Sequence, residues 1–196
     1  MRERKKNTQR SGFVVLVLFL FFLFIFPASL SAKNIYKKQL RASSRTKEVY
    51  QRDDLFASVR WHVTYQTPEF VQAKAEKMAK FYKYEGQKKQ DLIQAERAKF
   101  DAYTAFYISF YAYDYKYADI SNQDNHWKLY LEADGERFEP VKFERIEKVT
   151  PLYEVLYPYS NVWSRHYYVF FPKLNTDSLP VKLIVTGPTG SSELKW

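Results

Sequence analysis

The sequence predicts a mostly β fold with α+β content: an antiparallel, immunoglobulin-like β-sandwich of about six or seven short strands, with an inserted helical hairpin. Segments with an apolar residue at every second position recur along the chain, separated by turn signals. Good helix formers with a helical apolar spacing occupy residues 68–99. No strand-helix-strand unit repeats, which argues against a parallel sheet. A hydrophobic helix is expected to precede this domain.

The N-terminal segment has the anatomy of a signal peptide. Basic residues extend to Arg10, an apolar run covers 13–26, and Pro27 with small residues follows up to Ala32. The apolar run would rise about 21 Å as a helix, less than the roughly 30 Å hydrocarbon core, which favours cleavage. The uncharged stretch 11–32 is longer, so an uncleaved transmembrane anchor stays open. In both cases the basic residues stay cytoplasmic and the rest is translocated.

Three regions follow from this organisation. Residues 1–32 are a signal peptide or an uncleaved membrane anchor. Residues 33–52 are polar and basic without a clear apolar period, which predicts a linker. Residues 53–196 are predicted to form a single β-sandwich domain, with the helical insertion at about 68–99.

Composition limits the chemistry. The chain has no cysteine, so a disulfide framework, a thiolate metal site and the acylated cysteine of a lipoprotein are all excluded. The formal net charge is +9, but much of the basic excess lies in the first ten residues. The remaining domain is only mildly basic with both signs interspersed, so nucleic acid is not an expected partner.

The first elements of the domain follow from period and capping. Alternation over 57–65 places Val59, Trp61 and Val63 on one side of a strand. Thr67-Pro68-Glu69 then provides an N-cap, a first-turn proline and an early acid, which predicts a helix over 68–84 that Gly86 ends. A second helix is predicted over 88–99.

Further strands are predicted in the second half. The aromatic segment 100–114 alternates, with Phe106, Ile108 and Phe110 on one face and four tyrosines on the other. The segment 126–132 also alternates, and Asp134-Gly135 predicts a hairpin whose return strand runs through Phe143. Pro140 interrupts that return strand and indicates an edge position or a bulge.

The last segments combine a short helix with two strands. Thr150-Pro151 predicts a helix start with one or two turns through Leu156, before the aromatic loop 157–163. Strands are predicted over 167–171 and 181–186, and the remaining residues before Trp196 are expected to be a flexible tail.

The sequence predicts no catalytic, cofactor or metal residue. The histidines, at positions 62, 126 and 166, lack metal-ligand spacing, so structural or surface roles are expected. The segment 114–125 offers oxygen donors suited to calcium, but it lacks the EF-hand spacing and is interpreted as a hydrophilic loop. Residues 187–192 resemble a phosphate loop only in composition.

Aromatic side chains give the one candidate ligand or partner surface. Tyr157, Tyr159 and Trp163 lie in a loop with proline, serine and asparagine, which indicates surface exposure. The tyrosine face of 103–113 is a weaker candidate, because aromatics at strand spacing are more often core residues.

These observations predict an exported, bacterial-type cell-envelope protein that is not an enzyme. The leading hypothesis is an interaction or assembly module on the periplasmic side of the membrane, free in the periplasm or anchored to the inner membrane, with an envelope protein as its partner. An alternative is a periplasmic domain that binds a glycan or small ligand through the loop aromatics. A further alternative is an exported hydrolase without a recognisable motif.

Overall fold

The computed structural model describes residues 28–50, 57–122, 127–174, 180–188 and 190–196. The chain divides into two compact units, 1–37 and 38–196, and helix α2 (Ala28–Ser43) spans the division between them. The apolar run 13–26, predicted as a signal peptide or anchor, lies outside the described residues. Of the helices that are described, none is both long and apolar enough to cross a membrane.

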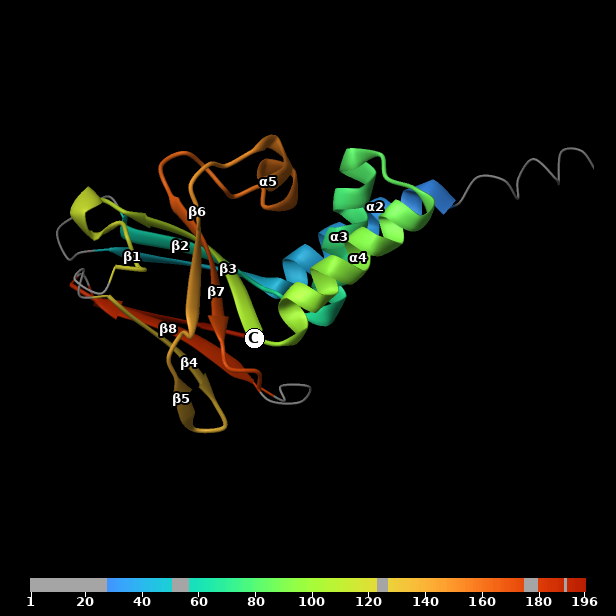
Figure 1. Cartoon of the computed structure of the whole chain (residues 1–196). Helices are drawn as coiled ribbons and strands as arrows, with labels where there is room; N and C mark the ends of the chain where they lie inside the picture. The colour runs from blue at the N-terminus through green and yellow to red at the C-terminus, as the bar shows by residue number, and fades with distance from the viewer. Residues whose placement is uncertain (1–27, 51–56, 123–126, 175–179, 189) are drawn as a thin grey trace, which may run out of the picture. The chain divides into compact units, whose positions relative to one another are not determined.

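Residues 38–196 contain two antiparallel sheets, with nine strands in the described part (Figure 1). The first sheet has the order β1 (Ser44–Tyr50), β2 (Ala57–Tyr65), β3 (Thr104–Ala112), β7 (Arg165–Phe171) and β6 (Lys142–Ile146). The second has the order β5 (Glu136–Phe138), β4 (Lys128–Ala133), β8 (Val181–Gly187) and β9 (Gly190–Lys195). The prediction of a mostly β, antiparallel fold with helices is therefore confirmed.

Both sheets contribute to one hydrophobic core. The predicted inward residues Val59, Trp61 and Val63 of β2 are buried in it, as are Phe106, Ile108 and Phe110 of β3. The second sheet adds leucines and valines of β4, β8 and β9 to the same cluster. Alternation placed these residues on the correct face because a strand's side chains point to opposite sides in turn.

The helical insertion lies between β2 and β3, as predicted. Its helices are α3 (Pro68–Tyr82) and α4 (Gly86–Asp101). The Thr67 side chain accepts a hydrogen bond from the Phe70 amide at 3.2 Å, which satisfies one of the free N–H groups at the helix start. The end of α3 differs from the prediction: Lys83 adopts the left-handed conformation there, and Gly86 begins α4.

The region around Pro140 corrects a second prediction. Asp134 and Gly135 both have positive φ, as a tight hairpin turn between β4 and β5 requires. The chain after this turn is not one interrupted strand, because β5 pairs in the second sheet and β6 pairs with β7 in the first. Pro140, which cannot donate to a ladder, lies where the chain passes from one sheet to the other.

Two segments predicted to be irregular are ordered by pairing. Residues of the expected linker 33–52 form the second half of α2 and the edge strand β1, which pairs with β2 along its length. The expected C-terminal tail forms β9, which pairs with β8. Arg45 Nε donates to the Lys195 carbonyl at 2.9 Å, and Trp196 Nε1 donates to the Ser43 carbonyl at 2.7 Å. These bonds join the two missed strands across the sheets.

Candidate binding site

The second face of the first sheet carries a buried polar layer, and residues of α3, α4 and the short helix α5 (Pro151–Leu156) pack against it. The ring of Tyr107 on β3 stacks on Tyr157 with centroids 3.6 Å apart. The Tyr157 hydroxyl lies 3.1 Å from the Tyr168 hydroxyl on β7. Because Tyr168 is buried, water cannot solvate its ionised form, and burial therefore raises the pKa of Tyr168 well above the usual value.

A buried lysine lies next to this layer. The Lys74 side chain on α3 is 1% exposed, and its Nζ lies 2.9 Å from Glu96 Oε2 on α4. The amine also lies 4.1 Å from the centre of the Phe100 ring. Burial lowers the pKa of Lys74 to about 8, although the Glu96 carboxylate opposes this shift. This ion pair holds α3 and α4, the two helices of the hairpin, together.

Gln66 connects the buried layer to an open cavity. Its Oε1 accepts from Lys74 Nζ at 3.1 Å and from the Tyr157 hydroxyl at 3.4 Å. Its Nε2 donates to the Thr64 carbonyl at 3.0 Å. With both ends of the amide engaged, the side chain is held in one orientation at the inner wall of the cavity.

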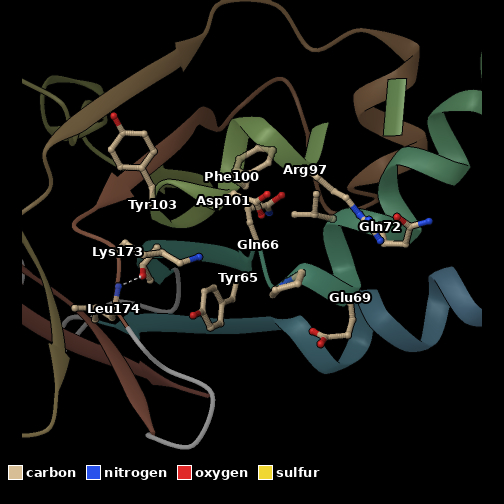
Figure 2. Close-up of a pocket in the computed structure, with 13 residues that line it drawn as sticks. Tyr65, Gln66, Glu69, Gln72, Arg97, Phe100, Asp101, Tyr103, Lys173 and Leu174 are labelled. Carbon is tan, nitrogen blue, oxygen red and sulfur yellow. Dashed lines mark hydrogen bonds between the residues drawn. The ribbon is translucent and has the colours of Figure 1, made fainter. Parts of the chain in front are cut away.

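The cavity has a volume of about 590 Å³ and lies where the hairpin joins the sheet; we call it the basal pocket (Figure 2). Its lining comes from the end of β2, the start of α3, the end of α4, the start of β3 and the segment after β7. The lining residues are Tyr65, Gln66, Pro68, Glu69, Val71, Gln72, Arg97, Phe100, Asp101, Tyr103, Thr104, Lys173 and Leu174. Cavities of this size hold small ligands or short peptide segments.

The inner wall of the basal pocket is neutral and fixed. Val71 and Phe100 are buried apolar residues, and Gln66 and Thr104 are buried polar ones. The Thr104 hydroxyl accepts from the Leu174 amide at 3.0 Å, which fixes the segment after β7 against β3 (Figure 2). The wall is thus preformed, which lowers the conformational entropy that a ligand must offset on binding.

The rim of the basal pocket carries charges of both signs. Glu69 and Asp101 are acidic, Arg97 and Lys173 are basic, and all four side chains are exposed. Figure 2 shows Arg97 and Lys173 on opposite sides of Gln66. Among the ion pairs of the described chain, none involves these four residues. Their charges are therefore available to a bound molecule.

No protein-family model matches the chain. No curated protein matches it either. The function proposed below therefore depends on the geometry of the site and on the sequence.

The three aromatic residues predicted to form a binding surface differ in their exposure to solvent. Tyr157 is fully buried, because it packs between Tyr107 and Phe70 of α3, so it is corrected to a core residue. Tyr159 is half-buried, stacks on His62 with centroids 5.0 Å apart, and hydrogen bonds to Thr64. Trp163 is 80% exposed. The three side chains therefore do not form a common platform.

The four tyrosines of the segment 103–113 also differ in their exposure to solvent. Tyr107 is buried in the polar layer and Tyr111 is half-buried, whereas Tyr103 and Tyr113 are exposed. Tyr103 lies at the rim of the basal pocket, so one residue of this weaker candidate surface does border the site (Figure 2).

The two histidines in the described part of the chain, His62 and His166, form hydrogen bonds within the protein. His62 lies 2.8 Å from the Thr46 hydroxyl, and burial lowers its pKa. His166 Nε2 lies 2.9 Å from the Asn161 carbonyl and its Nδ1 lies 3.1 Å from the Tyr107 hydroxyl. These bonds fit a neutral ring that donates from Nε2 and accepts at Nδ1, and burial lowers the pKa of His166. His126 lies outside the described residues.

Asp119 in the predicted hydrophilic loop serves packing. Its Oδ2 pairs with Arg165 at 2.9 Å and with Arg145 at 3.1 Å, and its Oδ1 accepts from the Tyr167 hydroxyl at 3.0 Å. The described part of the chain has no group of three metal-ligating side chains. Of the other four predicted donors of this loop, Asp114 and Asn122 lie in that part of the chain, and Asp124 and Asn125 lie outside it.

Sequence reasoning missed the basal pocket because its lining is spread over more than one hundred residues of chain. One local signal was present. Arg97 and Asp101 are four residues apart in the sequence, at the end of α4 that returns to the sheet, and the predicted second helix (88–99) includes only Arg97. A charged pair next to a strand start is common on solvated helices, so it did not point to a site by itself.

Proposed function

We propose that this protein is an exported, non-catalytic interaction module of the cell envelope, with its domain on the periplasmic side of the membrane. In this proposal it binds a peptide segment of an envelope protein in the basal pocket. The observation that carries the proposal is the ring of four exposed charges without ion pairs in the described chain, set around a fixed neutral wall.

The geometry favours a peptide with charges of both signs. Glu69 and Asp101 would pair with basic groups, and Arg97 and Lys173 with carboxylates. Such pairs select a partner by charge position, since a wrong arrangement brings like charges together. The exposed aromatic ring of Tyr103 adds apolar contact at the rim.

Two observations support a binding role over catalysis. The pocket lining contains no histidine, serine or cysteine, and the Thr104 hydroxyl is already engaged with the Leu174 amide. The two described histidines lie outside the pocket lining: His166 is bonded within the buried layer, and the half-buried His62 is bonded to the Thr46 hydroxyl. The N-terminal sequence anatomy supports export.

We also propose that the two sheets form an immunoglobulin-like sandwich in the sense of its layers. The common core of the two sheets supports this arrangement. The order β1-β2-β3-β7-β6 differs from the ABED and CFG orders of immunoglobulin domains, so the likeness concerns the layers and not the connections.

Binding in the basal pocket is tested by calorimetry on the exported form purified from cells. The probes are a zwitterionic Lys-Ala-Glu tripeptide, its uncharged analogue and a neutral disaccharide. We expect binding of the charged tripeptide only, weakened at least tenfold by Arg97→Gln and unchanged by Arg41→Gln, a matched exposed arginine outside the pocket. Tripeptide binding that Arg97→Gln leaves unchanged would refute the site.

The same titrations separate the alternatives. Binding of the disaccharide would favour the glycan-binding hypothesis, whereas cleavage of a probe would favour a hydrolase. Export is tested by fractionating cells and measuring the intact mass of the protein. A soluble species that begins near Ala32, or a full-length membrane species, agrees with the proposal, and full-length protein found only in the cytoplasm contradicts it.

A further inference from the structure

The tip of the α3–α4 hairpin carries three aromatic side chains that are in contact with water. Phe81, Tyr82 and Tyr84 are 42%, 44% and 38% exposed. They touch one another, because the rings of Phe81 and Tyr82 meet edge to face and those of Tyr82 and Tyr84 stack, each pair with centroids 5.4 Å apart. The three rings therefore form one patch, which we call the tip patch.

Basic residues surround the tip patch. Lys80, Lys83 and Lys88 are exposed and Lys89 is half-exposed, against the single acid Glu85 within 80–89. Across the described residues, none of these four lysines forms an ion pair. Lys88 Nζ lies 5.8 Å from the Tyr84 ring centre, so the positive charge lies next to the aromatic surface.

The hairpin geometry holds the tip patch away from the sheet. The end of β2 pairs with the start of β3, Tyr65 opposite Phe106, so α3 leaves and α4 returns at the same edge (Figure 1). The turn after Tyr82 is therefore at the far end of the hairpin, about 22 Å from this edge for the 15 residues of α3. The buried Lys74–Glu96 pair holds the two helices together below it.

We propose that the tip patch binds the surface of a bilayer that contains anionic phospholipid. Tyrosine and phenylalanine partition into the headgroup region, and lysines are attracted to anionic lipids, so the combination matches such a surface. The occupant is thus identified by both charge and aromatic character.

A membrane as the occupant rests on the proposed export and membrane attachment of the N-terminal segment, which would keep the domain close to a bilayer.

The absence of cysteine from the sequence allows one environment-sensitive dye to be placed at a single site. We would label Gln87→Cys next to the tip patch with NBD, with the full chain in phosphatidylcholine nanodiscs with or without phosphatidylglycerol. Gln94→Cys is the matched control, since it is exposed on the same face of α4 about 10 Å farther from the tip. We expect a blue shift at Gln87→Cys with phosphatidylglycerol, and little or none at Gln94→Cys.

Substitution of Lys80, Lys83 and Lys88 by glutamine should shift the equilibrium from lipid-bound toward free tip by about fivefold per lysine. Phe81→Ser with Tyr84→Ser should also reduce the blue shift, and circular dichroism checks that each variant is folded. The same shift in both lipids, no shift in either, or a shift that the lysine variant retains would each overturn the proposal. A shift that requires two chains per disc would indicate a second copy of this chain and would also overturn it. Since the assay does not use the basal pocket, tripeptide binding can fail or succeed independently.

Discussion

Replacing Glu96 by glutamine should destabilise the domain in a way that depends on pH. The substitution removes the carboxylate 2.9 Å from the amine of Lys74, which is almost completely buried. Breaking a buried ion pair on one side usually costs about 3–5 kcal/mol when the remaining group stays charged. Lys74 has another route, because its pKa is already lowered to about 8 and it can lose its proton.

That route sets an upper limit on the electrostatic cost. Deprotonating an amine of pKa about 8 takes on the order of 1 kcal/mol at pH 7 and on the order of 3 kcal/mol at pH 6. Near pH 8.5 the amine is mostly neutral, so Glu96→Gln should cost little there. Urea unfolding of wild type and variant at pH 6, 7 and 8.5 measures the difference. An equal loss of stability at pH 6 and pH 8.5 would refute this account of Lys74.

The wild-type protein should show the matching dependence. Because the pKa of Lys74 is lower in the folded state than its ordinary 10.5, the unfolded chain holds this proton more tightly. The resulting destabilisation, about 3 kcal/mol, is fully present below pH 8 and is relieved as pH rises toward 10.5. Lys74→Met should remove this rise, and the exposed Lys80→Met on the same helix should keep it. Buried tyrosines oppose the trend above pH 10, so the comparison is made between pH 7 and 9.5.

Three further outcomes are expected. Gly187→Ala should lower the Tm by several degrees, because the added Cβ would lie 2.1 Å from the Trp127 ring, and overpacking costs about 1–3 kcal/mol; Ser191→Ala is its control. Asp119→Asn should reduce stability at pH 7 but weaken the loss of stability in acid. Burial raises the pKa of Asp119, but hydrogen bonds from Ser121 and Tyr167 and the charge of Arg165 outweigh it and lower the pKa, so its stabilising effect is lost as pH falls below about 4. Trp163→Ala should change the free energy of unfolding by less than about 0.5 kcal/mol and leave tripeptide binding unchanged, because this side chain is 80% exposed.

The elements predicted correctly are those whose local pattern matches their surroundings. In β2 the alternation of Val59, Trp61 and Val63 reflects one face buried in the core, which the sequence records directly. In α3 the start depends on Thr67 and Pro68, whose effect is local to the first turn. Neither prediction needed information about distant parts of the chain.

The strands that sequence reasoning missed obtain their order from partners. Strand β1 is an edge strand of mostly polar residues, so its hydrogen bonds to β2, and not its own burial pattern, keep it extended. In β9 only Ser192 and Leu194 face inward, too few to give a clear alternation. The passage of the chain between sheets at Pro140 also depends on pairing that no local pattern encodes.

The candidate site illustrates the same limit. Tyr157 was expected at the surface from its loop composition, but α3 and the stacked ring of Tyr107 bury it. The basal pocket unites positions from Tyr65 to Leu174, which only the folded sheet and hairpin bring together. In the sequence, the exposed charges that define the basal pocket look like those of any solvated surface.

Site-specific photo-crosslinking in living cells tests the central claim most directly. A benzophenone amino acid replaces either Tyr103 at the rim of the basal pocket or Tyr113, which is more exposed but outside the pocket lining. The account predicts that the probe at Tyr103 captures one discrete envelope protein, that the probe at Tyr113 does not, and that Arg97→Gln strongly reduces the capture. No specific product at Tyr103, or the same product at both positions regardless of Arg97, would contradict a partner-binding role for the basal pocket.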